Sequence, residues 1–272
     1  DELRAVCDLA AEGLEYNWTA DEFVSAAARV TNAGPDERPV LAAFYAECLD
    51  QHHRGLDGLW PHVLRNAFMP AFIGKFDVAV GNPPWVNWES LPQRYRDLTD
   101  PLWRRYGLFV HGGMAAMLGA GKKDVSMLMS YVVTDKLLGD EGRLAFVVTQ
   151  TVFKTAGAGQ GFRRFRIGDG GPPIRIEHVD DMVDLKPFIG AANRTALFVW
   201  TKGKRIEYPV SYVLWQRLRP EGVPRNATLD QVLEMTRTLD LVAAPVDAHD
   251  LTSAWHSAPA ELVRPLRKLA QV

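Results

Sequence analysis

Residues 76–89 read FDVAVGNPPWVNWE, a short apolar run that ends in an asparagine, two prolines and a tryptophan. Such a run is typical of a strand buried on both faces of a parallel sheet, so residues 76–81 are predicted to form one. Prolines fix φ and lack an N–H, so Pro83 and Pro84 are expected to end the strand in a rigid turn. Functional crevices in open α/β sheets lie beyond the carboxyl ends of strands, where this turn falls.

The sequence on either side of this strand predicts an α/β sheet preceded by helices. Residues 1–72 read as a helical segment, and residues 73–204 as the sheet domain. Asp124 is expected to cap a helix over residues 125–138, followed by a turn, GDEG, at 139–142. A second buried strand is expected at 143–151.

Two more strands are predicted at 174–182 and 195–203. The link between them is short, which favours antiparallel neighbours, so the sheet is expected to end in an antiparallel edge pair. Residues 205–272 are rich in Pro, Arg and Asp and are interpreted as a connector to a further domain, with helices at 228–235 and 259–270.

Composition excludes several classes of protein. The chain has 272 residues, 47% hydrophobic and 24% charged, and no run approaches the ~20 apolar residues of a membrane helix. Cys7 and Cys48 are too few for a disulfide framework or a four-cysteine zinc site, so no metal site and a cytoplasmic location are predicted. The sequence has no signal peptide and no initiator methionine, so we expect a fragment of a longer polypeptide.

The turn itself indicates a binding chemistry. The side chain of Asn82 offers an acceptor and donors, the proline carbonyls are acceptors, and Trp85 offers a flat apolar face. Acceptors beside an aromatic platform suit a planar group that carries an amino donor, such as a nucleobase or an amide. The alternative is a strand terminator whose tryptophan covers the edge of the sheet, and the chemistry of the turn leaves both interpretations open.

Three blocks together carry a family resemblance. FDVAVGNPPWVNWE, GKKDVSMLMSYVVTDKLLGDEGRLAFVVTQTVFK (121–154) and VDDMVDLKPFIGAANRTALFVWTKG (179–203) occur in the order found in adenine-specific DNA methyltransferases. More narrowly, the chain resembles the methylases of type IIG restriction-modification and related phage-defence systems. The resemblance implies the C-terminal half of a class I (Rossmann-like) methyltransferase sheet. It also implies S-adenosylmethionine as cofactor and double-stranded DNA, with a flipped adenine, as substrate.

The resemblance also implies residue roles, with Asn82, Pro83, Pro84 and Trp85 as the catalytic motif. The side-chain carbonyl of Asn82 and the backbone carbonyl of Pro83 would accept the amino hydrogens of the adenine. Trp85 would stack on one side of the base and Phe188 on the other. Asp77 would make local hydrogen bonds, and Lys123 and Asp124 match the block that opens the next helix.

Basic clusters on the chain are either solvated faces or phosphate contacts. The candidate DNA contacts are Arg94, Arg104, Arg105, Arg163, Arg164 and Arg194. Arg194, with Asn193, would either touch phosphate or hold its own loop together.

The cofactor site is the missing part of the pattern. Residues 1–75 contain no strand that leads into a glycine-rich loop, so the site stays unassigned, with Asp77 and Asn82 as candidates. AGAGQG (156–161) is rejected because it follows the second block and VFKT separates it from the strand. We therefore expect a base-holding half that depends on an N-terminal cofactor half and a C-terminal target recognition domain. Without the cofactor half, a central strand edge would be exposed.

Two other functions remain open from the sequence. One is methyl transfer to RNA or to a protein glutamine, since those enzymes share the motif. The other is a non-catalytic remnant that keeps the fold as a DNA-binding or assembly surface.

Overall fold

The computed structural model describes residues 2–55, 74–109, 123–188, 194–220, 222–224 and 226–263. The chain forms two compact units, residues 1–74 and 75–272. Predictions that fall on residues 56–73, 110–122, 189–193 (including Asn193) and 264–272 lie outside the described residues.

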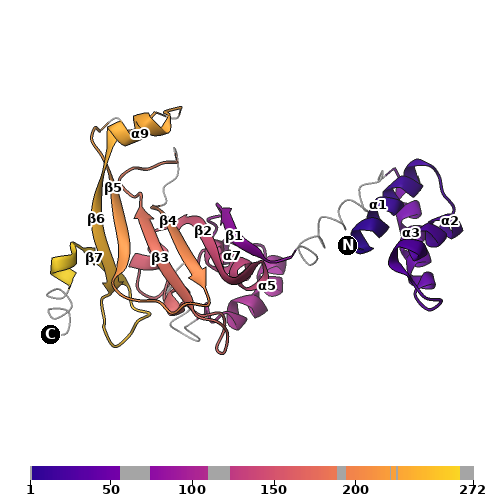
Figure 1. The fold of residues 1–272 in the computed structure, drawn as a ribbon, viewed down its shortest axis with the longest axis horizontal. Coiled ribbons are helices and arrows are strands. Elements are labelled where there is room, and N and C mark those ends of the chain that lie inside the picture. The colour runs from indigo at the N-terminus through magenta and orange to yellow at the C-terminus, as the bar shows by residue number, and fades with distance from the viewer. Residues whose placement is uncertain are drawn as a thin grey trace. The chain divides into compact units, whose positions relative to one another are not determined.

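The first unit is helical, as predicted. It contains α1 (Glu2–Glu15), α2 (Ala20–Thr31) and α3 (Arg38–His53) (Figure 1). A capping box begins α2, because the backbone N–H of Glu22 donates to Thr19 Oγ1 and that of Thr19 donates to the Glu22 carboxylate. Phe23 stacks on Tyr45 with ring centroids 4.3 Å apart, and both rings are fully buried. The stacked pair lies at the centre of the core of this unit.

The second unit is built on a seven-stranded mixed sheet, which confirms the α/β class (Figure 1). The strands lie in the order β1-β2-β4-β3-β5-β6-β7. Their bounds are β1 (Phe76–Gly81), β2 (Leu138–Thr149), β3 (Ile174–Asp181), β4 (Thr195–Lys202), β5 (Val210–Arg217), β6 (Thr236–Pro245) and β7 (Trp255–Ala258). The helices are α5 (Gln93–Arg105), α7 (Val125–Lys136), α8 (Thr151–Lys154) and α9 (Leu229–Met235), with short 3-10 turns η1 (Trp88–Ser90) and η2 (Phe162–Arg164).

The antiparallel pair exists but does not lie at the edge of the sheet. β4 pairs antiparallel with both β2 and β3, and β5, β6 and β7 continue the sheet beyond β3. These last three strands fall in the segment that the sequence indicated as a connector. Their apolar residues are spread thinly: in β5, Val210 and Tyr212 are buried while Ser211 between them is exposed. Because the apolar periodicity of this segment is weak, the sequence did not predict β5, β6 and β7.

β2 begins earlier than predicted. Residues 139–142, expected as a turn, form an irregularity inside the strand, because the pairing shifts from Phe76↔Leu138 to Val78↔Arg143. Glu141 has a φ of 58°, which is typical of such a local kink. The parallel pairing of β1 with β2, with α7 between them in the chain, is the crossover that the sequence predicts.

β1 is more exposed than predicted. Val78 is 58% and Val80 77% exposed, whereas a strand buried on both faces was expected. The physical reason is its position, since β1 is the outermost strand of the described sheet. An exposed apolar edge strand invites pairing with another chain or segment.

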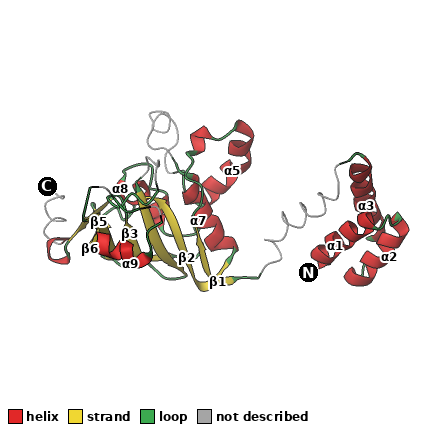
Figure 2. Ribbon diagram, turned by 90° about the horizontal axis from the view of Figure 1, so that it is seen from above, coloured by secondary structure: helices red, strands yellow, loops and turns green. Residues whose placement is uncertain are grey.

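One face of the sheet carries the core. Leu144, Phe146 and Val148 of β2 alternate onto it and lie opposite Trp200, Phe198 and Ala196 of β4. α7 packs on β2 over this face (Figure 2). Two buried polar side chains in this layer find partners: Trp200 Nε1 donates to Thr134 Oγ1 (2.9 Å), and the Tyr131 hydroxyl donates to the Phe162 carbonyl (2.7 Å).

Arg163 is part of this core rather than a DNA contact. It is 2% exposed, and its guanidinium donates to the backbone carbonyls of Thr252 (2.8 Å), Val152 (2.7 Å) and Thr155 (3.1 Å). Its prediction as a DNA contact is wrong, because those bonds join α8 to the segment before β7 and leave the cation no path to a phosphate. Burial lowers the pKa of Arg163 to about 10, which keeps it charged at neutral pH.

Replacing Arg163 with methionine should destabilise the fold by about 3 kcal/mol, because it orphans several buried carbonyls. The matched control is Arg164→Met. Arg164 ion-pairs with exposed Asp169 at 2.6 Å, so its loss should cost less than about 1 kcal/mol. Urea denaturation of both variants measures the difference, and equal losses would contradict the structural role of Arg163.

Candidate functional site

The NPPW turn lies directly after the last residue of β1. Asn82 and Pro84 are exposed, Pro83 is buried and Trp85 is half-buried. Gly81 pairs with Phe146, so the turn projects beyond the same edge at which β2 ends. The sequence therefore placed the turn correctly at the carboxyl end of two parallel strands.

Trp85 is oriented by one hydrogen bond. Its indole N–H donates to the carbonyl of Val147 on β2, at 3.1 Å. The bond holds one edge of the ring against the neighbouring strand. An indole fixed by its polar edge can serve as a stacking platform without further ordering cost.

The far side of the turn is anchored to the start of α7. Val125 N donates to the Val86 carbonyl (2.9 Å) and Trp88 N donates to the Lys123 carbonyl (2.7 Å). Asn87 and Asp124 form an isolated antiparallel bridge between these two bonds. The turn is thus held on one side by β1 and on the other by α7, which makes it rigid.

Asp124 caps α7 as predicted. Its carboxylate accepts from Ser126 N at 2.8 Å and is 5% exposed. Burial raises the pKa of Asp124, although the hydrogen bond from Ser126 acts in the opposite direction. Lys123 is also buried, and its ammonium lies 5.4 Å from the centroid of the Phe109 ring.

The structure brings the two predicted stacking aromatics together. The ring centroids of Trp85 and Phe188 are 5.3 Å apart with an interplanar angle of 80°, an edge-to-face contact. A base between two parallel rings needs about 3.5 Å on each side, or about 7 Å between the rings. Phe188 therefore has to turn or retreat before a base can lie between them.

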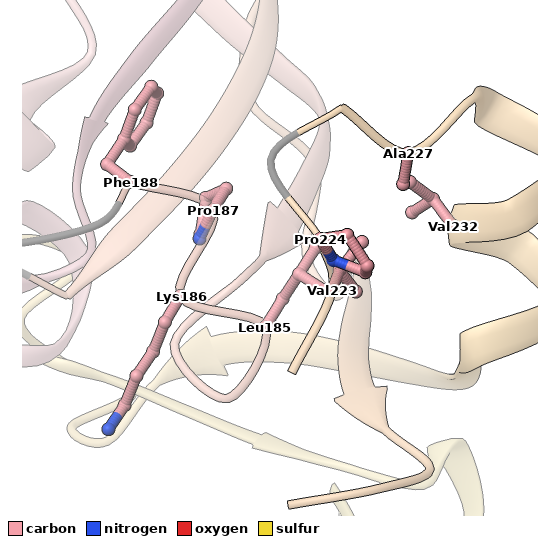
Figure 3. Close-up of a pocket in the computed structure, with 8 residues that line it drawn as sticks. All are labelled: Leu185, Lys186, Pro187, Phe188, Val223, Pro224, Ala227 and Val232. Carbon is pink, nitrogen blue, oxygen red and sulfur yellow. The ribbon is translucent and has the colours of Figure 1, made fainter. Parts of the chain in front are cut away.

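A cavity of about 350 Å³ borders the loop that carries Phe188. Leu185, Lys186, Pro187 and Phe188 line one side (Figure 3). The other side is lined by Val223, Pro224 and Ala227, with Val232 from α9. Figure 3 shows the Lys186 ammonium pointing away from the Phe188 ring, so the wall beside that ring is apolar.

The remaining predicted DNA contacts lie on the surface, most of them already paired. Arg104 pairs with Asp100 at 2.7 Å, Arg105 with Asp135 at 3.5 Å and Arg164 with Asp169 at 2.6 Å. Arg94 on α5 and Arg194 before β4 are exposed. Surface ion pairs contribute little to stability, so these arginines can exchange a carboxylate for a phosphate. Their contact with DNA stays a prediction.

Three aromatic residues that come after the turn in the chain pack into a cluster. Trp103 stacks on Phe109 with centroids 5.3 Å apart, and Trp88 meets the same ring edge-on at 5.1 Å. The guanidinium of Arg104 lies 5.8 Å from the Phe109 ring. The interleaved aromatics and arginines after the turn therefore pack together as a small cation–π cluster.

Sequence reasoning missed a buried polar group at the same edge. Gln150 follows β2, Asp181 ends β3, and Tyr212 lies on β5. The Asp181 carboxylate accepts from both Gln150 Nε2 (2.7 Å) and the Tyr212 hydroxyl. The signal available in the sequence was the aspartate at the end of an apolar strand, which does not specify its partners.

The two sequence-based candidates for the cofactor site, Asp77 and Asn82, are both exposed. Asp77 is exposed on β1, and its predicted local hydrogen bond is unsupported by any described contact. The glycines of AGAGQG are packing positions, since a Cβ on Gly159 would lie 2.2 Å from the Val152 carbonyl oxygen, and one on Gly161 2.5 Å from that of Leu108. That loop is closed by protein, which supports its rejection as the cofactor loop.

Comparison with known proteins identifies the class of the central segment. Residues 60–169 match the family model of Eco57I restriction-modification methylases. This match confirms the resemblance that the sequence motifs carry, and it covers the NPPW turn. None of the curated proteins matches the chain, and no helix in the described residues is long and apolar enough to cross a membrane.

Solved structures overlap the chain in part. The type ISP restriction-modification enzyme LlaGI, solved with a DNA substrate mimic, is 15% identical over 72% of this chain and 16% of its own, with a TM-score of 0.43. The type IIG endonuclease BpuSI is 18% identical over 63% and 19%, with a TM-score of 0.38. A type I methyltransferase subunit from Streptococcus thermophilus is 16% identical over 72% and 37%, with a TM-score of 0.35. The chain therefore spans well under half the length of each.

Replacing Asp124 tests the anchor of the turn. Asp124→Asn keeps the acceptor for Ser126 N without a charge to bury, whereas Asp124→Ala loses the cap and should be less stable than Asp124→Asn by about 1 kcal/mol. An acid whose pKa is raised by folding loses stability as pH rises from its usual value through the raised value. The stability of wild type relative to Asp124→Asn should therefore fall between about pH 4 and pH 7.

Urea denaturation of the three proteins at the two pH values measures both effects. A stability of wild type relative to Asp124→Asn that rose with pH instead would contradict the claim that burial raises the pKa of Asp124.

Proposed function

We propose that this chain supplies the base-holding part of an adenine-specific DNA methyltransferase of a restriction-modification or related phage-defence system. The observation that carries the proposal is the geometry of the turn. Asn82 is exposed at the end of β1, three residues from an indole fixed to Val147, and a second aromatic ring lies 5.3 Å away. The match of residues 60–169 to restriction-modification methylases supports the reaction class.

The turn would activate the amino group of the target adenine. Asn82 through its side-chain carbonyl, and Pro83 through its backbone carbonyl, would each accept one amino hydrogen. Two such bonds, held by a rigid backbone, direct the nitrogen lone pair out of the plane of the ring. The nitrogen then becomes a better nucleophile, and it can lose its extra proton to water after accepting the methyl group.

The aromatic pair would hold the flipped base. The edge-to-face contact of Trp85 with Phe188 is worth about 0.5–1.5 kcal/mol. Stacking of a base on an aromatic ring is worth about 1–3 kcal/mol. A base can therefore displace Phe188 from the face of Trp85 at little net cost, because it replaces a weaker contact with a stronger one.

S-adenosylmethionine would supply the methyl group in the complete protein. From the sequence we expect a glycine-rich cofactor half that precedes the NPPW block, and Asp77 and Asn82 would lie at the margin of that site. The exposed β1 edge is where such a part of the protein, or a partner chain, would join the sheet. A target recognition domain would provide the sequence-specific contacts.

The reaction is tested by the complete protein with tritiated S-adenosylmethionine and mixed-sequence double-stranded DNA. After digestion, the proposal expects label in N6-methyladenine. Label in RNA or in a protein glutamine, offered in parallel reactions, would replace DNA as the substrate. Absence of label from all three would favour a non-catalytic remnant.

Asn82→Ala should lower kcat by at least about a hundredfold, because the amino group loses an acceptor made for the transition state. Affinity for S-adenosylhomocysteine, measured by calorimetry, should change little. The matched control is Asn87→Ala, five residues along the same turn, whose side chain makes no capping bond and which should keep wild-type turnover. Wild-type kcat in Asn82→Ala would contradict the proposed role of the Asn82 amide.

A further inference from the structure

The loop between β3 and β4 carries Phe188, and Gln150 holds both of its ends. Gln150 N donates to the carbonyl of Arg194, the last residue before β4, at 2.7 Å. Gln150 Nε2 donates to the carboxylate of Asp181, the last residue of β3, at 2.7 Å. Gln150 and Asp181 are 8% and 4% exposed, so both bonds are shielded from water.

The Asp181 carboxylate extends this link to two further elements. It accepts from the hydroxyl of Tyr212, in the middle of β5, and from Val183 N, in the loop itself, at 3.1 Å. Tyr212 is fully buried, and its burial, together with the carboxylate beside it, raises its pKa far above the ordinary value. The tyrosine therefore stays protonated and continues to donate.

The orientation of the Gln150 amide is set by Asp181. Its Oε1 is buried without a hydrogen-bond partner among the described residues, while Nε2 faces the carboxylate. The opposite rotamer of the amide would turn its oxygen toward Asp181, which is repulsive, so the carboxylate fixes the orientation. The bond to Asp181 therefore sets the conformation of the Gln150 side chain.

The same strand end also holds Trp85. Val147, which accepts the indole N–H, lies three residues before Gln150. The end of β2 thus fixes both aromatic walls of the proposed base site, Trp85 through Val147 and the Phe188 loop through Gln150. We propose that Gln150 and Asp181 are positioning residues that set the spacing between Trp85 and Phe188; this inference rests on the proposed function of that site.

The described part of this loop, residues 182–188, is bonded to β5 near its start and borders a cavity further along. Arg217 N donates to the Asp184 carboxylate at 2.9 Å, which ties the loop to β5. Beyond Asp184, the residues 185–188 border the 350 Å³ cavity (Figure 3). The Phe188 ring therefore has room to move away from Trp85 when a base enters. The bonds of Gln150 and Asp181 would hold the start of the loop in place during this movement.

The test exchanges the two partners in the complete protein. Gln150→Glu sets two carboxylates against each other, and Asp181→Asn sets two amides together. The double variant Gln150→Glu/Asp181→Asn restores one carboxylate and one amide with the hydrogen bond reversed. The matched control is Gln216→Glu, the same change on β5, where Gln216 accepts from Arg237 at 2.9 Å and a carboxylate would be tolerated.

Three quantities are measured: kcat for adenine methylation, the dissociation constant for DNA, and the fluorescence of 2-aminopurine placed at the target position. Each single variant should lower kcat by about ten- to a hundredfold through misplaced stacking. The 2-aminopurine signal should change, and DNA affinity should move less than about threefold, because phosphate contacts dominate it. The double variant should regain most of the kcat and the 2-aminopurine signal of wild type.

Wild-type kcat and 2-aminopurine signal in both single variants would overturn the inference. So would a folded double variant, checked by its melting temperature, that stays as slow as the singles. A wild-type protein that methylates no adenine would instead overturn the proposed function, and the positioning role with it.

Discussion

The parallel pairing of β1 with β2 is the constraint on which the site depends. Because the two strands run in the same direction, the turn after Gly81 and the end of β2 project at one edge of the sheet. Val147 can then accept the indole N–H of Trp85, and Gln150 can reach the loop after β3. Reversal of either strand would separate the turn from every partner that orients it.

The site combines a rigid half with an adjustable one. The turn is held by β1 and by the backbone pairing with the start of α7, so the proposed acceptors at Asn82 and Pro83 have a fixed place. Phe188 lies on a loop that borders a cavity, and its contact with Trp85 is of the weak edge-to-face kind. This division suits a site in which the reacting atom must be fixed while the base has to enter and leave.

The local features of the fold could be predicted from the sequence, because they depend on short-range chemistry. The strand before NPPW and the Asp124 cap of α7 are both confirmed. Features that depend on tertiary pairing could not be predicted. The GDEG stretch looks like a turn but lies within β2, because β1 pairs with residues on both sides of it, Leu138 and Arg143.

The same distinction explains why Arg163 was misassigned from the sequence and why the buried polar group near the turn was missed. Arg163 and Arg164 are adjacent and identical in type, yet one is bonded to buried carbonyls and the other is paired at the surface. Nothing local separates them, so both read as DNA contacts. The polar group of Gln150, Asp181 and Tyr212 comes from the end of β2, from β3 and from β5, which are separated in the chain, and only the strand order brings them together.

The most direct test of the account is a crystal structure of the complete protein bound to DNA that contains its modification site. The account predicts an adenine outside the duplex, stacked on Trp85, with its amino nitrogen about 3 Å from the Asn82 side-chain oxygen. Phe188 should have left the edge of Trp85. A bound duplex whose target base lies away from the NPPW turn, with the contact between Trp85 and Phe188 intact, would contradict it.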